Sequence, residues 1–509
     1  MTGVEQARAL IRATRTELGG DPRVDAELRA CEQRLDEPLR VALTGALKSG
    51  KSTLLNALVG EEIAPTDATE CTRVVTWFSR GAAPRIDLVH DGGVVTSLPV
   101  LRAGGRLSLD LGAVTADRVG RLEVRWPSAL LERYTLVDTP GTSSNSRDVS
   151  ERTLAFLEPE DGPCEADVIV YLMRNLHDSD VQFLRRLREH RGAGAGPLGV
   201  VGVLSRADET DGGRGASLEA AHRVRGELRA ARELDGLHQD FVPVSGLLAL
   251  RGQTLRQSEF TALRALAGVP EDTLATAMIS TSRFTRPESD LPVSAARRAQ
   301  LLDTFGVFGI RVAVSAIRSG AADASALAAE LVRRSGLDEL RRSLDIRFGQ
   351  RNGQLKTHAA LRSLRRILLR HRRPGTGRLL RSTDRLLADR HAFVELRVLS
   401  GLHVLELPEP IRDTLELVLG GAGTSATQRL GLPRDAPPAQ VRDTALRAVR
   451  FWRDRLEHPV LDVVTAQAYR AAVRSCEAVL AHTPAAPRAA AWPVPAAPLA
   501  AVTPMARSW

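Results

Sequence analysis

The strongest indication of the fold of this chain is the octapeptide Gly45-Ala46-Leu47-Lys48-Ser49-Gly50-Lys51-Ser52. It fits the phosphate-binding loop pattern G-x-x-x-x-G-K-[ST], in which backbone N–H groups wrap the phosphates of a nucleotide. The residues before it, 40–43, predict a short strand, and the residues after it, 52–59, predict a helix. Because the motif requires this strand–loop–helix context, we expect Lys51 to reach the β- and γ-phosphates and Ser52 to bind Mg²⁺.

Lysine is rare in this chain, and its placement supports the same interpretation. Only three of the 70 basic residues are lysines, and two of them, Lys48 and Lys51, lie in the octapeptide. A compact ammonium reaches a phosphate where the broad planar group of arginine does not fit. The third, Lys356, is expected on a solvated helix face. The residues expected to contact the nucleotide here are Gly45, Ser49, Gly50, Lys51, Ser52 and Thr53.

Alternating strand and helix patterns surround the loop. Buried strands are predicted at 134–137, 167–172, 198–204 and 241–244, and further strands or hairpins at 73–78, 85–90, 94–100 and 121–126. Helical patterns cover 147–158, 178–190 and 216–234. This order predicts an α/β P-loop domain with a doubly wound, mostly parallel sheet.

The rest of the chain is predicted to be helical. Residues 1–37 read as helices, the α/β domain covers 38–252, and long Arg/Leu/Ala patterns follow in 253–345 and 346–482. Residues 335–370 are compatible with one long helix, which Gly349 and Gly353 can interrupt. The Ala/Pro-rich tail, 483–509, is expected to be disordered.

Two motifs are expected near the phosphates. Asp138-Thr139-Pro140-Gly141 follows a buried strand, so Asp138 can hold Mg²⁺ through water and the Gly141 N–H can meet a γ-phosphate. The alternative is an ordinary strand-to-turn junction, since Pro-Gly favours turns. Thr72 precedes a predicted strand and is our choice for the γ-phosphate sensor and metal ligand, whereas Thr66 and Thr69 are expected to be loop polar groups.

Two further motifs are expected near the base. Asp208, in Ser205-Arg206-Ala207-Asp208, can accept from the two N–H groups of guanine, a donor pair that adenine lacks, and Arg206 can stack over the base. Ser205 and Arg206 replace the usual Asn/Thr-Lys, and a polar turn is the alternative. Ser245-Gly246 follows the last predicted strand and is a weaker guanine contact. The predicted ligands are therefore GTP or GDP with Mg²⁺.

Composition limits the remaining classes of function. The net charge of +9 and a pI near 10.1 suit an anionic partner, although so small an excess is also ordinary solvation. The four cysteines show no C-x-x-C spacing, so neither a disulfide framework nor a zinc site is indicated. The charged first 37 residues do not read as a signal peptide. No run of about 18 uncharged apolar residues occurs, so no transmembrane helix is expected.

These motifs, in this order and with helices on both sides, resemble the bacterial dynamin-like GTPases, and the actinobacterial isoniazid-inducible type in particular. The strings that carry the resemblance are the octapeptide with Thr53-Leu54-Leu55-Asn56-Ala57-Leu58, Cys71-Thr72-Arg73-Val74-Val75-Thr76, and Asp138-Thr139-Pro140-Gly141. The resemblance implies a GTPase head on an extended α-helical neck and trunk, with residues 1–37 packing against helices that follow the head. It also implies that heads pair across the nucleotide and that the trunk tip touches membrane.

One departure from the wider superfamily concerns catalysis. Animal-type dynamins usually carry Gln-Ser where this chain has Leu47-Lys48, and many bacterial members share a hydrophobic-Lys pair. Leu47 cannot orient the attacking water, so hydrolysis is expected to be slow or to use another group. We hypothesise that the Lys48 ammonium stabilises charge between the β- and γ-phosphates. The alternative is that Lys48 is a solvated loop residue.

Two segments are candidates for membrane contact. The first is an arginine cluster around Pro374-Gly375, with interleaved leucines that can embed shallowly in anionic lipid. The second is the apolar stretch 392–408. The alternative for the arginine cluster is a helical hairpin with solvated faces. The cluster contains Arg362, Arg365, Arg366, Arg370, Arg372, Arg373, Arg378, Arg381, Arg385 and Arg390.

Two functions remain open at this stage. The first is a GTPase that assembles on and remodels bacterial membrane from the cytoplasm, peripheral to the inner face of the cell membrane. The second is a regulatory or scaffolding GTPase that pairs with another dynamin-like GTPase and has no lipid activity of its own. Nucleic acid is not expected as a partner, because the basic stretch lacks interleaved aromatics and no recognition module is evident.

Overall fold

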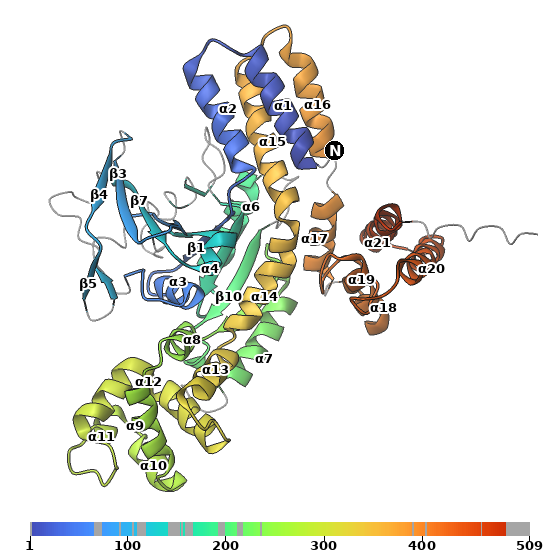
Figure 1. Ribbon diagram of the computed structural model, residues 1–509. Coiled ribbons are helices and arrows are strands. Elements are labelled where there is room, and N and C mark those ends of the chain that lie inside the picture. Colours follow the sequence, from blue (N-terminus) through green and yellow to red (C-terminus); the bar gives the residue numbers. More distant parts are fainter. Residues whose placement is uncertain are drawn as a thin grey trace, which may run out of the picture.

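The architecture is an α/β domain with helical groups above, below and beside it (Figure 1). The computed structural model describes residues 3–65, 74–90, 93–103, 106–108, 119–140, 153, 156–157, 166–191, 199–210, 217–234, 237–388, 391–402, 405–459 and 461–484. The described ranges leave out Thr66, Thr69, Thr72, Gly141, Arg390 and most of the predicted helix at 147–158 and of the predicted tail.

The α/β domain is built on a nine-stranded sheet with the order β11-β10-β9-β1-β8-β2-β7-β3-β4. The first five strands in this order are parallel to one another, and β2 joins β8 antiparallel. The mostly parallel sheet that the sequence predicts is therefore confirmed. The strands are β1 (Leu39–Gly45), β2 (Thr76–Arg80), β3 (Arg85–His90), β4 (Val95–Leu98), β7 (Val119–Trp126), β8 (Tyr134–Asp138), β9 (Val168–Met173), β10 (Val200–Ser205) and β11 (Phe241–Val244), with a separate pair β5 (Leu101–Ala103) and β6 (Arg106–Ser108).

Helices cover this sheet because its central strands are apolar on both faces. Val168–Met173 and Val200–Ser205 are buried at every position, which is the pattern of a parallel strand between two helical layers. The helices of this domain are α3 (Lys51–Val59), α4 (Ala129–Arg133), α6 (Asp178–Arg191), α7 (Ser217–Ala230), the short η4 (Arg232–Leu234) and α8 (Gly246–Gln253).

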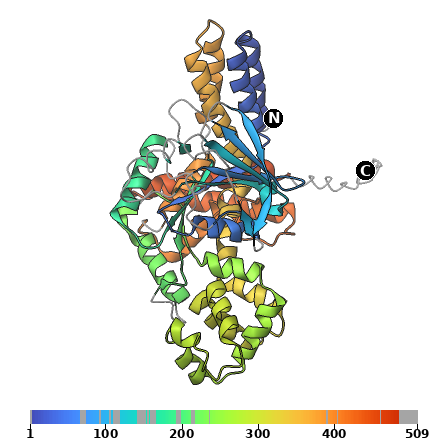
Figure 2. The same cartoon turned by 90° about the vertical axis from the view of Figure 1, so that its left-hand side faces the viewer.

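A compact helical group lies at the lower end of the molecule (Figures 1 and 2). It has its own apolar core, which includes Phe260, Leu263, Leu301 and Leu327. Its helices are α9 (Gln257–Ala267), α10 (Glu271–Ala277), α11 (Thr281–Phe284), α12 (Ala295–Arg318) and α13 (Ala324–Arg334). By length and composition α12 is apolar enough to cross a membrane, with a mean hydropathy of 1.4 over its most apolar window, but half of that window is buried inside the protein.

A helical bundle lies at the opposite end (Figure 1). Its four helices are α1 (Gly3–Glu17), α2 (Pro22–Arg34), α15 (Asn352–Arg370) and α16 (Thr376–Ala388), two antiparallel pairs from residues 3–34 and 352–388. Buried apolar side chains such as Ile11, Leu28 and Leu364 fill its centre. The N-terminal helices thus pack against helices that follow the head, as the resemblance implies.

Five further helices form a separate cluster at the side of α14 (Leu337–Arg347) and α15 (Figure 1). They are α17 (His391–Gly401), α18 (Glu409–Val418), α19 (Ala426–Arg429), α20 (Pro438–Leu456) and α21 (Val463–His482), with Trp452 at the centre of their core. Residues 346–482, which the sequence predicts as one helical trunk, are therefore divided between the bundle and this side cluster.

Two local expectations differ from the structure, and the structure decides a third that the sequence left open. Residues 335–370 are interrupted at the first of the two glycines that the sequence offered: α14 (Leu337–Arg347) and α15 are separated by the 3₁₀ turn η5 (Gly349–Arg351). Lys356 is not on a solvated face, because it is buried and its Nζ donates to the Glu37 carbonyl at 2.8 Å. The leucines interleaved in the arginine cluster, such as Leu368 and Leu379, lie in the bundle core rather than on a tip that can embed.

The second candidate membrane segment, 392–408, is also folded into the protein. Leu396 is fully buried, and Leu399 and Leu402 are nearly so. The reason is that α17 packs between the junction of α14 and α15 on one side and the side cluster on the other. Among its described residues, this segment therefore offers no large apolar face to a membrane.

Candidate nucleotide site

The phosphate-binding loop lies at the carboxyl end of β1, in the middle of the parallel part of the sheet. A Cβ atom at Gly45 would lie 2.2 Å from the Leu172 carbonyl oxygen of the neighbouring strand β9. Gly50, at the start of α3, has a φ of 93°. Both positions therefore require glycine, one for close approach and one for its left-handed conformation.

Lys51 is folded back into the loop. It is buried, and its Nζ donates to the carbonyl oxygens of Gly45 at 3.1 Å and Ala46 at 3.2 Å. Burial lowers the pKa of the Lys51 ammonium, and the nearby Asp138 acts in the opposite direction. A phosphate is a better partner for a buried ammonium than two neutral carbonyls, because charge-assisted hydrogen bonds are stronger.

Ser52 and Asp138, 86 positions apart in the sequence, meet beside the loop. The Ser52 hydroxyl donates to Asp138 Oδ2 at 2.8 Å, because α3 starts next to the end of β8. The other carboxylate oxygen, Oδ1, is buried and has no partner among the described residues, and the same holds for the Ser49 hydroxyl. Burial raises the pKa of Asp138, against the effects of Lys51 and Ser52. Hydroxyl and carboxylate oxygens of this kind fit a magnesium ion.

The predicted base-contact motif lies across from the loop. Arg206 reaches back to the loop: its Nη2 donates to the Lys48 carbonyl at 3.1 Å, and its Nη1 to Glu209 Oε1 at 2.7 Å. Lys48 and Arg206 are the non-glycine residues with positive φ in the described chain, at 60° and 52°. Such backbone positions cluster at functional sites.

A cavity of about 200 Å³ joins the two sides of the site. Asp208, Arg206 and Gly246 line it together with Ser49, Gly50 and Thr53, so the structure brings these predicted residues to one place. Ser205 also lines the cavity, but its hydroxyl donates to the Met173 carbonyl at 3.0 Å and so holds the motif against β9. Ser245 does not line the cavity: it is fully buried, and its side chain accepts from the Leu248 N–H as the N-cap of α8.

Some predicted residues lie elsewhere. Thr72 and Gly141 fall outside the described residues. Lys48 is exposed. Its neighbour Leu47 is also exposed, with 57% of the surface of Leu47 accessible. The sequence reading missed Glu209, which lines the cavity and pairs with Arg206 and Arg174. The sequence could have indicated Glu209, because it lies three residues after Arg206 and a turn after a strand brings residues at this spacing close together.

Comparisons with known proteins identify the family of this chain. Residues 41–206 match the Dynamin family. The chain is 47% identical to the Isoniazid-induced protein IniC of Mycobacterium tuberculosis, over 95% of this chain and 99% of that protein. The Isoniazid-induced protein IniA of the same organism is 28% identical over 46% of this chain and 34% of its own length.

A solved bacterial dynamin from an oligomerised pair overlaps 94% of this chain and 76% of its own, with a TM-score of 0.31 and 12% identity. The long, high-identity match and the family match together confirm the resemblance drawn from the motifs. The chain belongs to the bacterial dynamin-like GTPases, of the isoniazid-induced type.

Proposed function

We propose that this chain binds GTP with Mg²⁺ and hydrolyses it to GDP and phosphate. The observation that supports this most directly is the Ser52–Asp138 contact beside the folded-back Lys51. On binding, Lys51 would leave the Gly45 and Ala46 carbonyls for the β- and γ-phosphates. Ser52 and Asp138 would hold the metal, which neutralises charge that develops on the transferred phosphate. Thr72 and Gly141 are proposed to complete the γ-phosphate contacts.

The base preference rests on Asp208. Its carboxylate accepts two hydrogen bonds from the guanine edge, whereas an amide at this position presents one donor and one acceptor. Asp208→Asn is expected to weaken GTP binding at least about tenfold and to improve binding of xanthosine triphosphate, because xanthine carries an oxygen where guanine has an amino group. Fluorescence titration with both nucleotides tests this, and an unchanged GTP affinity would reject the assignment of Asp208.

Hydrolysis is tested separately from binding. Phosphate release from GTP should depend on Mg²⁺ and should be lost in Lys51→Ala. Ser52→Ala should raise the Mg²⁺ concentration required, because it removes one ligand oxygen. A preparation that binds GTP but releases no phosphate at any Mg²⁺ concentration would restrict the protein to a binding role.

We further propose that GTP turnover is coupled to assembly on, and remodelling of, bacterial membrane, at the inner face of the cell membrane. Seven arginines of the cluster are exposed on α15, α16 and the turn that joins them: Arg365, Arg370, Arg372, Arg373, Arg378, Arg381 and Arg385. Anionic lipid attracts each basic residue near its surface by about 1 kcal/mol. Since the neighbouring leucines are buried, the contact would be electrostatic and shallow.

The second candidate is a scaffolding GTPase that pairs with itself or with another dynamin-like GTPase. One observation favours it: Leu368 and Leu379 of the first candidate membrane segment, and Leu399 and Leu402 of the second, are used in the protein core. The presence of a second, 28% identical dynamin-like protein alongside the 47% identical one in Mycobacterium tuberculosis is compatible with such pairing.

Vesicle flotation separates the two candidates. The protein should float with phosphatidylglycerol-containing vesicles at low salt. The triple variant Arg372→Gln/Arg378→Gln/Arg381→Gln should not bind the vesicles and should remain at the bottom of the gradient. Arg434→Gln/Arg447→Gln/Arg450→Gln is the control, because it removes the same charge from exposed positions in and near α20. Absence of flotation with and without GTP, together with GTP-dependent sedimentation without lipid, would favour the scaffolding function.

A further inference from the structure

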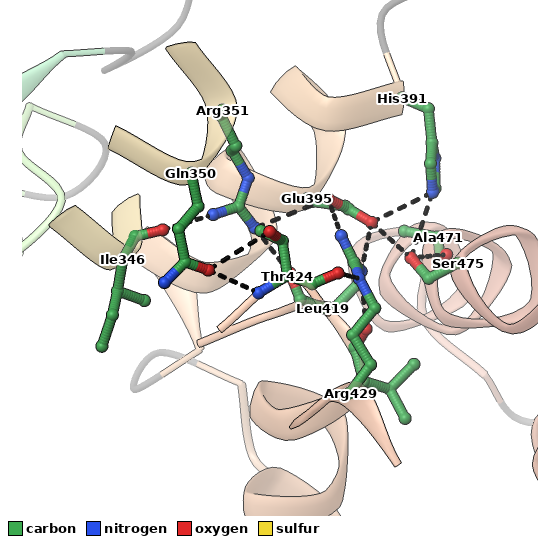
Figure 3. Close-up of polar contacts among 11 residues, drawn as sticks. Ile346, Gln350, Arg351, His391, Glu395, Leu419, Thr424, Arg429, Ala471 and Ser475 are labelled. Atoms are coloured by element: carbon green, nitrogen blue, oxygen red, sulfur yellow. Dashed lines mark hydrogen bonds and ion pairs between the residues drawn. The ribbon is translucent and has the colours of Figure 1, made fainter. Parts of the chain in front are cut away.

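A second cavity lies beside the break between α14 and α15, away from the nucleotide site. Its volume is about 820 Å³, and none of its lining residues lines the nucleotide cavity. Its walls come from η5, the helices α1, α15, α16, α17 and α21, and the segment 424–429, so residues far apart in the sequence meet here. Figure 3 shows the polar side chains that converge on one wall.

The titratable side chains that line this cavity are basic with one exception. Glu395 is the single carboxylate among its described lining residues. The basic residues are Arg351, Arg429, Arg474, His358, His391 and His482. The three arginines outnumber the one carboxylate, and such a cavity favours an anionic ligand.

Glu395 balances one of the three arginine charges, and its oxygens are already engaged by side chains of the protein (Figure 3). Arg429 donates to both of them, at 2.6 and 3.0 Å, and Ser475 donates at 2.7 Å. His391 Nε2 and Arg351 Nη2 lie 3.2 and 3.5 Å away. The carboxylate keeps its negative charge, but a ligand does not need to supply it with further donors.

Arg351 provides the second, independent observation. It is only 2% exposed, and its two terminal nitrogens donate to the carbonyls of Ile346 and Leu419, both at 2.9 Å. Its Nε is buried without a partner among the described residues, and so is the hydroxyl of Thr357, which lines the same cavity. Buried polar groups of native proteins normally have partners, so these two donors indicate an acceptor that the chain itself does not supply.

The volume and the donor types define the ligand. The cavity is many times larger than the roughly 30 Å³ that one water occupies, and it falls in the size range of small-molecule sites. Guanidinium and hydroxyl donors that line one cavity match the several acceptor oxygens of a phosphate better than the two of a carboxylate. We propose that this cavity binds a phosphate monoester of sugar-phosphate size, through Arg351, Thr357 and the rim residue Arg474.

The test is isothermal titration of the full chain with glucose 6-phosphate, and with glucose as the uncharged control. The nucleotide site is first saturated with GDP and Mg²⁺, so that it does not contribute phosphate binding. Saturable binding of the ester, and none of glucose, is expected. A parallel arm with phosphatidylcholine vesicles, with and without phosphatidic acid, shows whether the phosphate comes from a soluble molecule or from a lipid headgroup.

Two variants locate the binding. Thr357→Val/Arg474→Gln should weaken it at least about tenfold, the effect of losing one charge-assisted hydrogen bond. Arg470→Gln, which removes an exposed charge one turn earlier on α21 and outside the cavity, should leave it unchanged. Thermal unfolding of each variant confirms that it is folded.

The site is supported if either phosphate probe binds and Thr357→Val/Arg474→Gln weakens that binding. The probe that binds more tightly shows whether the phosphate comes from a soluble molecule or from a lipid headgroup. The proposal is overturned if neither probe binds saturably, or if the cavity variant and Arg470→Gln bind equally well. GTP binding by Lys51→Ala is measured on separate samples. Failure of the nucleotide site and failure of this cavity are therefore distinguishable.

Discussion

At the scale of single residues, the three lysines have three different environments. Lys51 is buried against backbone carbonyls of its own loop, Lys48 is exposed at the mouth of the same loop, and Lys356 is buried between the head and the bundle. Burial lowers the pKa of Lys356, while the surrounding acidic groups Asp167, Asp36 and Glu37 act to raise it. The ammonium is tolerated there because the Glu37 carbonyl accepts its hydrogen bond.

Lys356→Met is expected to destabilise the protein by about 1–3 kcal/mol, because a buried carbonyl acceptor loses its donor while the apolar stem keeps its packing. Urea unfolding measures this. Lys48→Ala is the control and should leave the unfolding midpoint unchanged, since Lys48 is exposed. Equal midpoints for the two variants would contradict a structural role for Lys356.

Lys48 itself is expected to act on turnover. If its ammonium stabilises charge between the β- and γ-phosphates, Lys48→Ala should lower kcat about tenfold or more and change GTP affinity less. Lys48→Arg keeps the charge and should retain more of the rate. Single-turnover hydrolysis and nucleotide titration give the two quantities, and an unchanged kcat in Lys48→Ala would leave Lys48 as a solvated loop residue.

At the scale of secondary-structure elements, the break at Gly349–Arg351 decides how the helices are arranged. Phe348, with a φ of −123°, leaves the helical conformation, and Arg351 turns into the protein toward Glu395 of α17. Glu395 in turn contacts Arg429 at the end of α19 and Ser475 of α21. One buried carboxylate thereby connects the neck helices to the side cluster.

Glu395→Gln is expected to destabilise the protein by about 3–5 kcal/mol, because two buried guanidinium groups lose the charge that pairs with them. Glu330→Gln is the matched control. Neighbouring arginines hold the pKa of Glu330 at about 2 as well, but the group lies on the surface, so its loss should cost less than about 1 kcal/mol. Urea unfolding distinguishes them, and similar costs would show that the Glu395 contacts are not stabilising.

The same carboxylate predicts an acid sensitivity. Burial acts to raise the pKa of Glu395, but hydrogen bonds from His391 and Arg429 outweigh it and lower the pKa from 4.5 to about 2. Because the folded state holds the proton less tightly than the unfolded state, this contribution is complete above about pH 4.5 and is lost as the pH falls toward 2. Stability of the native chain should fall in that window, and Glu395→Gln should show a smaller fall.

At the scale of the whole molecule, buried ion pairs join the head to the helices that leave it. Asp240, just before β11, contacts Arg225 and Arg229 of α7 and Arg347 of α14, with Arg347 at 3.3 Å. Burial acts to raise the pKa of Asp240, but the three arginines outweigh it and lower the pKa. The orientation of α14 on the head therefore depends on a contact between residues more than 100 positions apart.

Asp240→Asn should weaken the contact between α14 and the α/β domain without disturbing the nucleotide site. Amide hydrogen exchange is expected to increase in α14 and α7, while GTP affinity stays within about twofold, because Asp240 does not line the nucleotide cavity. Exchange that is unchanged in α14 would show that other contacts fix the head on the neck.

The sequence alone predicts the α/β domain, because its signals are local. The glycine spacing of residues 45–52 and the predicted strands 167–172 and 241–244 each follow from which side chains a phosphate loop or a buried strand accepts. The same local rules identified Ser52, Asp138 and Asp208 as site residues. The structure brings Ser52 and Asp138 into contact and places Asp208 at the adjoining cavity.

The burial and the partners of the helical residues follow from the tertiary structure and not from the sequence pattern. An Arg/Leu helix has the same periodicity whether its leucines face lipid or another helix, and only the packing of α1 and α2 shows that Leu368 and Leu379 are core residues. Lys356 and Glu395 likewise acquire their roles from carbonyls and guanidinium groups far away in the sequence. Burial and charge pairing depend on distance in space, and a periodic sequence pattern specifies only a face, not its partner.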